Sequence, residues 1–283
     1  MTICNLAKQC LLEDPTVLKV RPHIHIIGDI KGNYNSIWDM IQTNETTDQF
    51  LFLGDYVNEG KNSIEVITLV LCMKLIAPKQ VFLLRGSSET PGMTRRLGFK
   101  NECEERYDNE LYHKFIEVFD CMPLAAVIND EENTKSILCL NGGISPEFTS
   151  LKRLEKVERP LKESDMILVH SMLWSDPTTK VNKFGQHTKQ PGSYVYGKES
   201  AHQFLKENHI DQIIRSHQYQ EKGYCYPYGD NDHSVLSIFS APFYYNGKEH
   251  RNIGTTVYVR ESMLYTLNNF RGDKHKINNE YQY

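Results

Sequence analysis

Three residues whose side chains bind cations or transfer protons stand just after short apolar runs. Asp29 and Asp55 each follow such a run and a glycine, and His217 follows a third run that ends at residue 214. A carboxylate that bridges two cations, with further hard ligands around it, is what a two-metal hydrolase centre requires. Glycine–aspartate pairs also mark ordinary turns, so the alternative is two tight turns and a core histidine.

Buried strands are the elements that would hold these side chains in place. Short runs rich in Ile, Val, Leu and Phe each end abruptly in a polar or glycine cluster, as buried strands do at a functional edge. Ligands gather where such strands hand over to loops. A helical spacing of apolar residues between the second and third runs predicts a β-α-β unit, and a second helix is expected over 106–120. The expected strands are 23–27, 50–53, 81–84, 136–140, 212–214 and 235–239.

Composition narrows the class of protein. The chain has 283 residues, 40% hydrophobic and 24% charged, with a formal net charge of −4. This balance argues against disorder, a coiled coil or a fibre, and the absence of a clustered basic run argues against nucleic acid as a partner. The longest apolar stretch, 64–77, is interrupted by Glu65 and Lys74 and is too short for a membrane span. Seven cysteines without a C-x-x-C pair indicate neither a disulfide framework nor a thiolate zinc site.

The organisation along the chain is that of one unit. There is no internal repeat, Pro/Gly/Ser linker or break in composition, so we expect a single domain over 1–283. The first fifteen residues lack the features of a secretory signal, and we therefore expect a cytoplasmic or nuclear protein.

The order of the motifs along the chain resembles the phosphoprotein phosphatase family, the metal-dependent serine/threonine phosphatases of the protein phosphatase 1 type. This resemblance implies an α/β fold of the calcineurin-like metallophosphoesterase kind, with a central β-sandwich flanked by helices. It covers nearly the whole chain. The matching segments are CLLEDPTVL (10–18), GDIKG (28–32), FLGDYVNEGKNSIE (52–65), LLRGSSE (83–89), GFKNECEERY (98–107), FDCMPLAAVI (119–128), LNGGISP (140–146), LWSDP (173–177), IIRSHQ (213–218) and FSAPFYYN (239–246).

The positions that match the family's metal ligands are only partly retained. The resemblance assigns metal-binding roles to Asp29, Asp55 and His217, which remain as remnants of the two sites. A family histidine beside Asp29 is replaced by Lys31, whose protonated ammonium has only hydrogen-bond donors. In the second site, Ser87 stands at the position of the family's asparagine ligand, and Asn141 stands at the position of a histidine ligand.

The positions that match the family's proton donor and phosphate clamp have also changed. The histidine that protonates the leaving group corresponds to Ser88, and the aspartate that orients it corresponds to Asn58. A serine hydroxyl cannot act as a general acid near neutral pH as an imidazolium can. The two clamping arginines correspond to Glu59 and Lys189, whereas a tyrosine beside the substrate is retained as Tyr244. Glu59 places negative charge where a phosphate would dock, which opposes substrate binding.

We expect the Lys31 ammonium to replace the first metal. Two carboxylates about 4 Å apart repel by roughly 4 kcal/mol at an effective dielectric of 20, so Asp29 and Asp55 need a positive charge between them. The hypothesis predicts an ion pair of Lys31 with Asp29, Asp55 or both; the alternative is a solvated surface lysine in a turn. No cofactor is expected beyond at most one weakly bound divalent metal at Asp55 and His217.

These changes favour a pseudophosphatase, a folded scaffold that binds proteins or regulates a complex without catalysing a reaction. The alternative is a residual metal-dependent serine/threonine phosphatase with one weak metal site. Two lesser hypotheses are a serine nucleophile at Ser87 or Ser88 and a reader of phosphorylated peptides that uses Lys31, Arg85 and Lys189.

A protein partner is expected to dock through a short linear motif. Members of the resembled family bind Val-x-Phe-type peptides at a sheet edge by β-augmentation. The alternative is that Met263–Leu267 is simply a final core strand, and Gln212 replaces a family leucine in this groove. The matching positions are Tyr226, Met263, Leu264, Tyr265 and Leu267.

Overall fold

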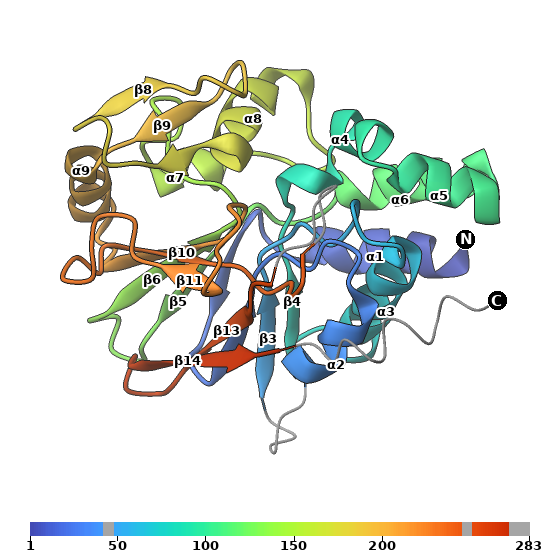
Figure 1. Cartoon of the computed structure of the whole chain (residues 1–283), viewed down its shortest axis with the longest axis horizontal. Coiled ribbons are helices and arrows are strands. Elements are labelled where there is room, and N and C mark those ends of the chain that lie inside the picture. The colour runs from blue at the N-terminus through green and yellow to red at the C-terminus, as the bar shows by residue number, and fades with distance from the viewer. Residues whose placement is uncertain (42–47, 245–250, 272–283) are drawn as a thin grey trace.

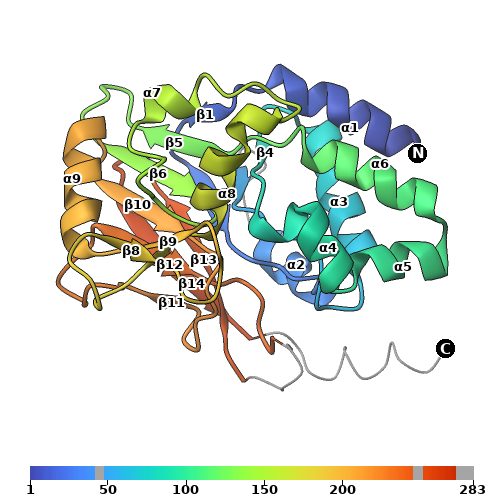
Figure 2. The same cartoon turned by 90° about the horizontal axis from the view of Figure 1, so that it is seen from above.

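Two β-sheets packed against each other form the centre of the protein, and helices cover their outer faces (Figure 1). The structure is a computed structural model that describes residues 1–41, 48–244 and 251–271. The view from above shows α1 to α6 on one side of the sheets and α7 and α9 on the other (Figure 2). The fold is therefore the α/β arrangement, with a central β-sandwich, that the sequence led us to expect.

The larger sheet has the strand order β1-β5-β6-β10-β12-β11 among the described residues. Strand β10 lies parallel to both β6 and β12, whereas β5 and β6 are antiparallel. Its strands are β1 (Val17–Val20), β5 (Ala125–Asn129), β6 (Ser136–Leu140), β10 (Gln212–Arg215), β11 (Tyr224–Cys225) and β12 (Val235–Ile238).

The second sheet has the order β14-β13-β2-β3-β4 in the described part of the chain. Strands β2, β3 and β4 are parallel, with Phe52 opposite both Ile27 and Leu83. Their carboxyl ends therefore reach the same edge of the sheet in step. The strands are β2 (Ile24–Ile27), β3 (Gln49–Phe52), β4 (Val81–Leu83), β13 (Gly254–Val259) and β14 (Tyr265–Phe270). A small third sheet contains β7 (Asp176–Pro177), β9 (Tyr194–Tyr196) and β8 (Phe184–Gln186).

The helices form two groups. The first group packs on the smaller central sheet and consists of α1 (Thr2–Glu13), α2 (Tyr34–Ile41), α3 (Ser63–Ile76), α4 (Pro91–Arg96), α5 (Phe99–Arg106) and α6 (Asn109–Phe119), with the single turn η1 (Ser87–Glu89) before α4. The second group comprises α7 (Leu151–Leu154), η2 (Glu163–Asp165), α8 (Met166–Trp174) and α9 (Lys198–Asn208). No helix in the described residues has the length and apolarity that a membrane span needs.

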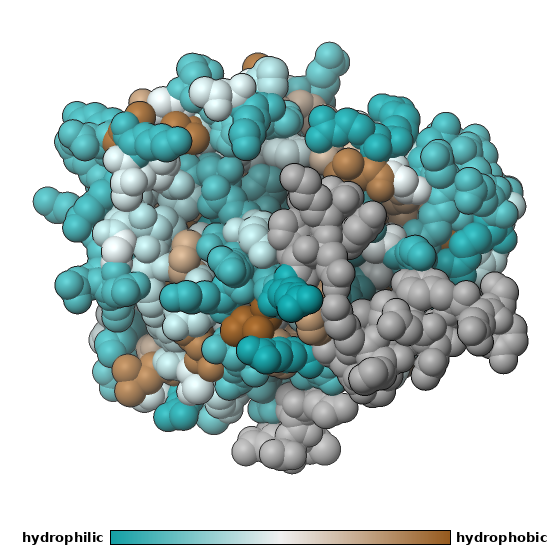
Figure 3. All heavy atoms as spheres, in the orientation of Figure 1, coloured by the Kyte–Doolittle hydropathy of each residue, from teal (hydrophilic) through white to brown (hydrophobic). Residues whose placement is uncertain are grey.

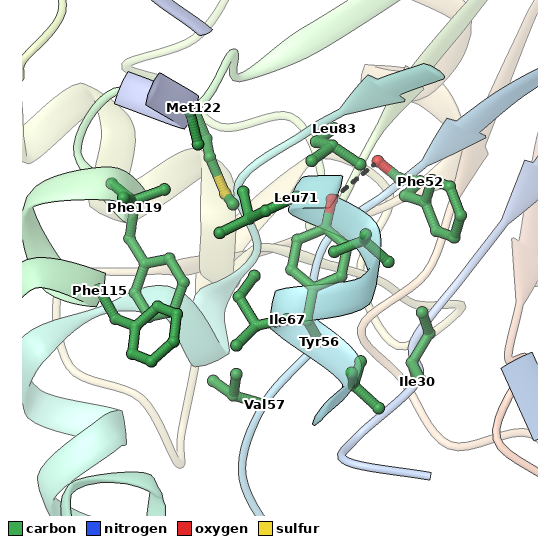
Figure 4. Packing of buried hydrophobic residues seen from close by; sticks show 14 of the residues in the cluster. Ile30, Phe52, Tyr56, Val57, Ile67, Leu71, Leu83, Phe115, Phe119 and Met122 are labelled. Atoms are coloured by element: carbon green, nitrogen blue, oxygen red, sulfur yellow. Dashed lines mark hydrogen bonds between the residues drawn. The ribbon is translucent and has the colours of Figure 1, made fainter. Parts of the chain in front are cut away.

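Apolar packing fixes the strands whose ends carry the site. Between the sheets, alternate side chains of both form one buried cluster that includes Ile26, Leu51 and Ile214. On the outer face of the smaller sheet, Phe52 and Leu83 pack with Tyr56 against helices α3 and α6 (Figure 4). The Tyr56 hydroxyl donates to the Leu84 carbonyl at 2.9 Å, so this buried ring also satisfies its polar atom.

Two expected elements differ from the structure. The helix expected over 106–120 is wrong at its start, because Arg106 ends α5 and Asp108 caps a new helix by accepting from the Leu111 N–H at 2.8 Å. The final strand begins at Tyr265 rather than Met263, because Met263 occupies a turn with φ 61°. In both places a local turn interrupts a pattern of apolar residues that continues through it.

Candidate functional site

The ends of strands from both sheets meet at one place. Asp29 follows β2, Asp55 follows β3, and Ser87 begins η1 after β4. From the larger sheet, Asn141 follows β6 and His217 lies just beyond β10, which is in register with β6. The parallel arrangement thus brings together residues separated by up to 188 positions, as the direct bond from the His217 N–H to Asp29 Oδ1 at 2.8 Å demonstrates.

The loop that contains Asp55 and the loop that contains Gly86 pack backbone against backbone. A Cβ added to Gly86 would lie 2.3 Å from the Asp55 nitrogen, so only glycine fits there. Asp55 itself has φ 57°, in the left-handed region that costs non-glycine residues about 1–2 kcal/mol. Four other site residues adopt the same left-handed conformation: Lys31, Asn58, Glu59 and His217.

The Lys31 ammonium lies among the carboxylates of the site. Its Nζ is 2.8 Å from Asp55 Oδ2, 3.6 Å from Asp29 Oδ2 and 3.8 Å from Glu59 Oε2. It also donates to Ser88 Oγ at 3.1 Å. The Lys31 side chain is only 10% exposed, and those of Asp29 and Asp55 are fully buried. This lysine is therefore part of a buried ion cluster and not a solvated turn residue.

Burial and charge displace the pKa values of this cluster in opposite directions. Desolvation alone would lower the pKa of Lys31, but the carboxylates of Asp55 and Asp29 outweigh it and raise that pKa well above its ordinary value. Desolvation would raise the pKa of Asp55, yet Lys31 and His217 bring that pKa well below its usual range. Both shifts favour the charged forms near neutral pH, so Lys31 and Asp55 form an ion pair.

Asp29 differs from Asp55 in its surroundings. Desolvation, followed by repulsion from Asp55, raises the pKa of Asp29 to about 6. Its Oδ1 accepts from the His217 N–H, whereas its buried Oδ2 has no hydrogen-bond partner among the described residues and only the longer contact with Lys31. Lys31 thus compensates Asp55 more fully than Asp29.

The residues at the positions of the second metal site form hydrogen bonds with one another. Ser87 Oγ lies 3.2 Å from Asp55 Oδ1 and 3.1 Å from His217 Nδ1. The Asn141 amide oxygen accepts from the Ser87 N–H at 3.0 Å, and its NH₂ donates to Ser216 Oγ at 3.2 Å. The oxygen and nitrogen atoms that would face a cation here bond to one another.

The residues at the proton-donor and clamp positions make structural contacts. Asn58 Nδ2 donates to the Ser88 carbonyl at 3.1 Å, and its Oδ1 accepts from the Phe99 N–H at 3.3 Å. Glu59 accepts a 2.7 Å hydrogen bond from the Tyr244 hydroxyl. The Glu59 carboxylate therefore lies beside the ion cluster and adds negative charge there.

Two of the sequence-derived candidates lie away from this cluster. Lys189 is exposed beyond β8, and among the described residues no hydrogen bond or ion pair joins its ammonium to the ion cluster. Arg85 is buried beneath η1, where its Nη2 pairs with Asp120 at 2.8 Å. Among the described residues, no hydrogen bond or ion pair brings Lys31, Arg85 and Lys189 onto a common group.

The structure adds two residues that the sequence reasoning did not single out. Glu89 is fully buried, and its carboxylate accepts from the N–H groups of Asp55, Tyr56 and Gly86 at 2.8 to 2.9 Å. Burial and the nearby Asp55 raise the pKa of Glu89 to about 8. Trp174 packs edge-on against the His217 ring, with centroids 5.2 Å apart. Glu89 directly follows the paired serines, which was a signal available in the sequence. Trp174 gave no such signal.

The donor set does not fit a two-metal centre. An ammonium lies between the two carboxylates of the first site, and a hydroxyl lies between the carboxylate and the imidazole of the second. Divalent cations prefer negatively charged or neutral lone-pair donors, which an ammonium cannot provide. Within the described residues, no group of three or more His, Cys, Asp and Glu side chains is placed to hold a metal ion.

Residues 22–221 match the family model of the calcineurin-like phosphoesterases. The chain belongs to that family. Its structure resembles a protein serine/threonine phosphatase from Saccharomyces cerevisiae, described as similar to human phosphatase PP5, with a TM-score of 0.83 and 24% identity over 97% of this chain and 89% of that one.

A second solved structure shows how far the fold extends beyond one activity. The cold-active protein-tyrosine phosphatase of a Shewanella species matches with a TM-score of 0.59 and 15% identity over 93% of this chain and 84% of that one. Two phosphatases described with different substrates thus share this fold. The fold is shared, but the activity of this chain depends on its own site.

Proposed function

We propose that this protein is a pseudophosphatase, a phosphatase-like scaffold that binds proteins and does not hydrolyse phosphate esters. The observation that carries the proposal is the position of the Lys31 ammonium, 2.8 Å from Asp55 Oδ2 and 3.6 Å from Asp29 Oδ2. A cation that is part of the chain neutralises these carboxylates without supplying a reactive hydroxide. A divalent ion brought to the same place would meet repulsion from the ammonium.

The remaining contacts support the same conclusion. Ser88 accepts from Lys31 and is buried, so it has neither the pKa nor the position of a general acid. Glu59 lies 3.8 Å from the Lys31 Nζ, and its charge would repel a phosphate dianion at this edge. A residual one-metal phosphatase would require Ser87 to leave its contacts with Asp55 and His217.

The edge strand β14 is the proposed protein-docking surface. Leu264, just before it, is 61% exposed, whereas Met263 is buried in the core between the sheets. The Tyr226 and Tyr265 hydroxyls lie 2.9 Å apart, and Gln212 donates to Tyr265 at 3.0 Å. Leu267 also packs against that core, so Leu264 is the residue most available to a partner.

Metal analysis and a hydrolysis assay test the proposal directly. The purified protein should contain well below one equivalent of manganese, iron or zinc, and it should not cleave an aryl phosphate when Mn²⁺ is added. The variant Asp55→Asn serves as the matched blank, since it removes the carboxylate any metal would need. Activity of the native chain above that blank would refute the proposal.

Partner binding is tested with a pair of matched variants. Leu264→Asp should lose partners recovered by affinity purification and mass spectrometry. Ile76→Asp is the control, because Ile76 is also apolar and 84% exposed but lies at the end of α3. Equal partner recovery by both variants would exclude β14 as the docking surface.

A further inference from the structure

The ion cluster of the candidate site holds more negative than positive charge. Three carboxylate oxygens lie 2.8 to 3.8 Å from the Lys31 Nζ, one each from Asp29, Asp55 and Glu59. Among the described residues, Lys31 is the one cation that forms an ion pair with Asp29 or Glu59. Because Lys31 lies closest to Asp55, the charges of Asp29 and Glu59 are the ones left in excess.

One of these carboxylates lacks a hydrogen-bond donor. The Asp29 side chain is fully buried, and its Oδ2 accepts no hydrogen bond from the residues that the structure describes. This oxygen faces Lys31 at 3.6 Å, whereas Oδ1 accepts from the His217 N–H at 2.8 Å. A buried carboxylate with an unsatisfied oxygen costs free energy, part of which a further cation nearby would recover.

Glu59 connects the buried carboxylates to the solvent. Its side chain is 16% exposed, compared with 10% for Lys31 and none for Asp29. The Glu59 Oε2 accepts from the Tyr244 hydroxyl at 2.7 Å, whereas Oε1 accepts no hydrogen bond within the described part of the chain. Glu59 is therefore the carboxylate of the cluster that a donor from solvent reaches first.

Aromatic rings lie beside this carboxylate. Tyr244 stacks on Tyr219 with ring centroids 5.9 Å apart, and Phe239 meets Tyr244 edge-on at 5.1 Å. A guanidinium stacks on aromatic rings and also forms paired hydrogen bonds with a carboxylate. On the face that Figure 3 shows, hydrophobic residues form only small, separate groups on a mostly hydrophilic surface, so recognition through that face is chiefly polar.

We propose that this site binds an arginine side chain of a partner protein, whose guanidinium pairs with Glu59 on the solvent side of Lys31. The inference rests on the binding role proposed above and names the group that is recognised. The guanidinium does not need the place between Asp29 and Asp55 that the ammonium occupies. It is weakly hydrated and presents several donors, so it tolerates partial burial better than a lysine ammonium. A phosphorylated side chain would instead be repelled by Glu59.

The experiment uses the full chain and short labelled peptides that differ only at one central residue. That residue is arginine, lysine, phosphoserine or citrulline, which keeps the shape of arginine without its charge. Binding is followed by peptide anisotropy in about 0.1 M salt. The arginine peptide should bind about tenfold more tightly than the citrulline peptide, with lysine between them and phosphoserine weakest. Equal affinity for arginine and citrulline, or tighter binding of lysine or phosphoserine than of arginine, would overturn the proposal.

Charge variants locate the bound group. Glu59→Gln removes the charge at a partly exposed position and should weaken the arginine peptide about tenfold. Glu105→Gln is the matched control, because Glu105 is exposed on α5, outside the ion cluster, and it should bind like the native chain. Glu59→Arg should reverse the preference, so that phosphoserine binds more tightly than arginine. Arginine binding that survives both substitutions of Glu59, or that Glu105→Gln weakens equally, would refute the assignment.

A buried variant tests the contribution of the unsatisfied carboxylate. Asp29→Asn removes the second excess charge and should weaken the arginine peptide severalfold, in a protein that urea unfolding shows to be folded. Unchanged affinity in folded Asp29→Asn would contradict the role of Asp29. Self-association that Glu59→Gln abolishes would identify a second copy of this chain as the source of the arginine, and would overturn the assignment to a separate partner.

Metal content and hydrolysis, measured on the same preparation, separate this inference from the proposed function. An inactive, metal-free protein that does not distinguish arginine from citrulline refutes arginine recognition alone. An active protein whose arginine binding depends on Glu59 supports arginine recognition and refutes only the lack of catalysis.

Discussion

Replacing Lys31 with methionine removes the ammonium of the ion cluster and keeps most of the unbranched apolar stem of the side chain. At an effective dielectric of 20, the 2.8 Å contact with Asp55 corresponds to an attraction of about 6 kcal/mol, much of which desolvation offsets. What remains after the change is a set of buried or half-buried carboxylates, Asp29, Asp55 and Glu59, without their cation. Removing one partner of a buried pair costs about 3–5 kcal/mol, and we expect Lys31→Met to lower the free energy of unfolding by that amount.

Urea unfolding followed by tryptophan fluorescence near pH 7 measures this effect. Lys8→Met is the matched control, because Lys8 also forms a close ion pair, with Glu117 at 2.6 Å, but its side chain is 30% exposed. We expect the control to lose no more than about 1 kcal/mol, in keeping with exposed ion pairs. Added salt should reduce the small effect at Lys8 more than the large one at Lys31, since buried charges are poorly screened. A loss below about 1 kcal/mol for Lys31→Met would contradict the role assigned to this lysine.

Three further changes test the surroundings of Lys31. Lys31→His should destabilise the protein without metal, and millimolar Mn²⁺ should recover stability only in that variant; recovery in the native chain would argue against ammonium replacement. The pKa of Asp29 is raised from 3.8 to about 6 in the folded protein, so between these pH values the folded state binds a proton that the unfolded chain does not. The contribution of Asp29 to the free energy of unfolding should therefore rise as the pH falls from about 7 to about 4. Asp29→Asn should remove this contribution in denaturation curves at several pH values, and an unchanged slope would contradict it. Glu89→Ala leaves the buried N–H groups of Asp55, Tyr56 and Gly86 without their acceptor and should cost about 3 kcal/mol or more of unfolding free energy, whereas the exposed Glu105→Ala should cost almost nothing.

Six strands of the two central sheets followed from the sequence, whereas β1, β5 and β13 and the order of the strands within each sheet did not. The run 136–140 is apolar from Ile137 to Leu140 and is followed by polar Asn141, and the structure has β6 at Ser136–Leu140. Buried strands carry this signal because both faces must be apolar. The helix expected over 106–120 was less accurate, since the break at Asp108 depends on one side-chain hydrogen bond that the apolar spacing does not report.

The residues of the candidate site were available from the sequence, but their partners were not. Residue types at strand ends identified Asp29, Asp55 and His217, and the resemblance to the phosphatase family added Lys31 as the cation that the two carboxylates need. Distances between segments far apart in the chain decide the contacts. They determine that Lys31 pairs with Asp55, that Ser87 bonds to Asp55, and that Glu89 accepts from the Asp55 N–H.

The physical reason is that local sequence sets backbone preference and burial pattern, whereas electrostatic interactions depend on distance in space. The sequence by itself indicated six of the sheet-forming segments and the residue types at their ends. The tertiary structure alone decided that Lys31 lies closer to Asp55 than to Asp29, which holds the pKa of Asp55 low and leaves that of Asp29 raised.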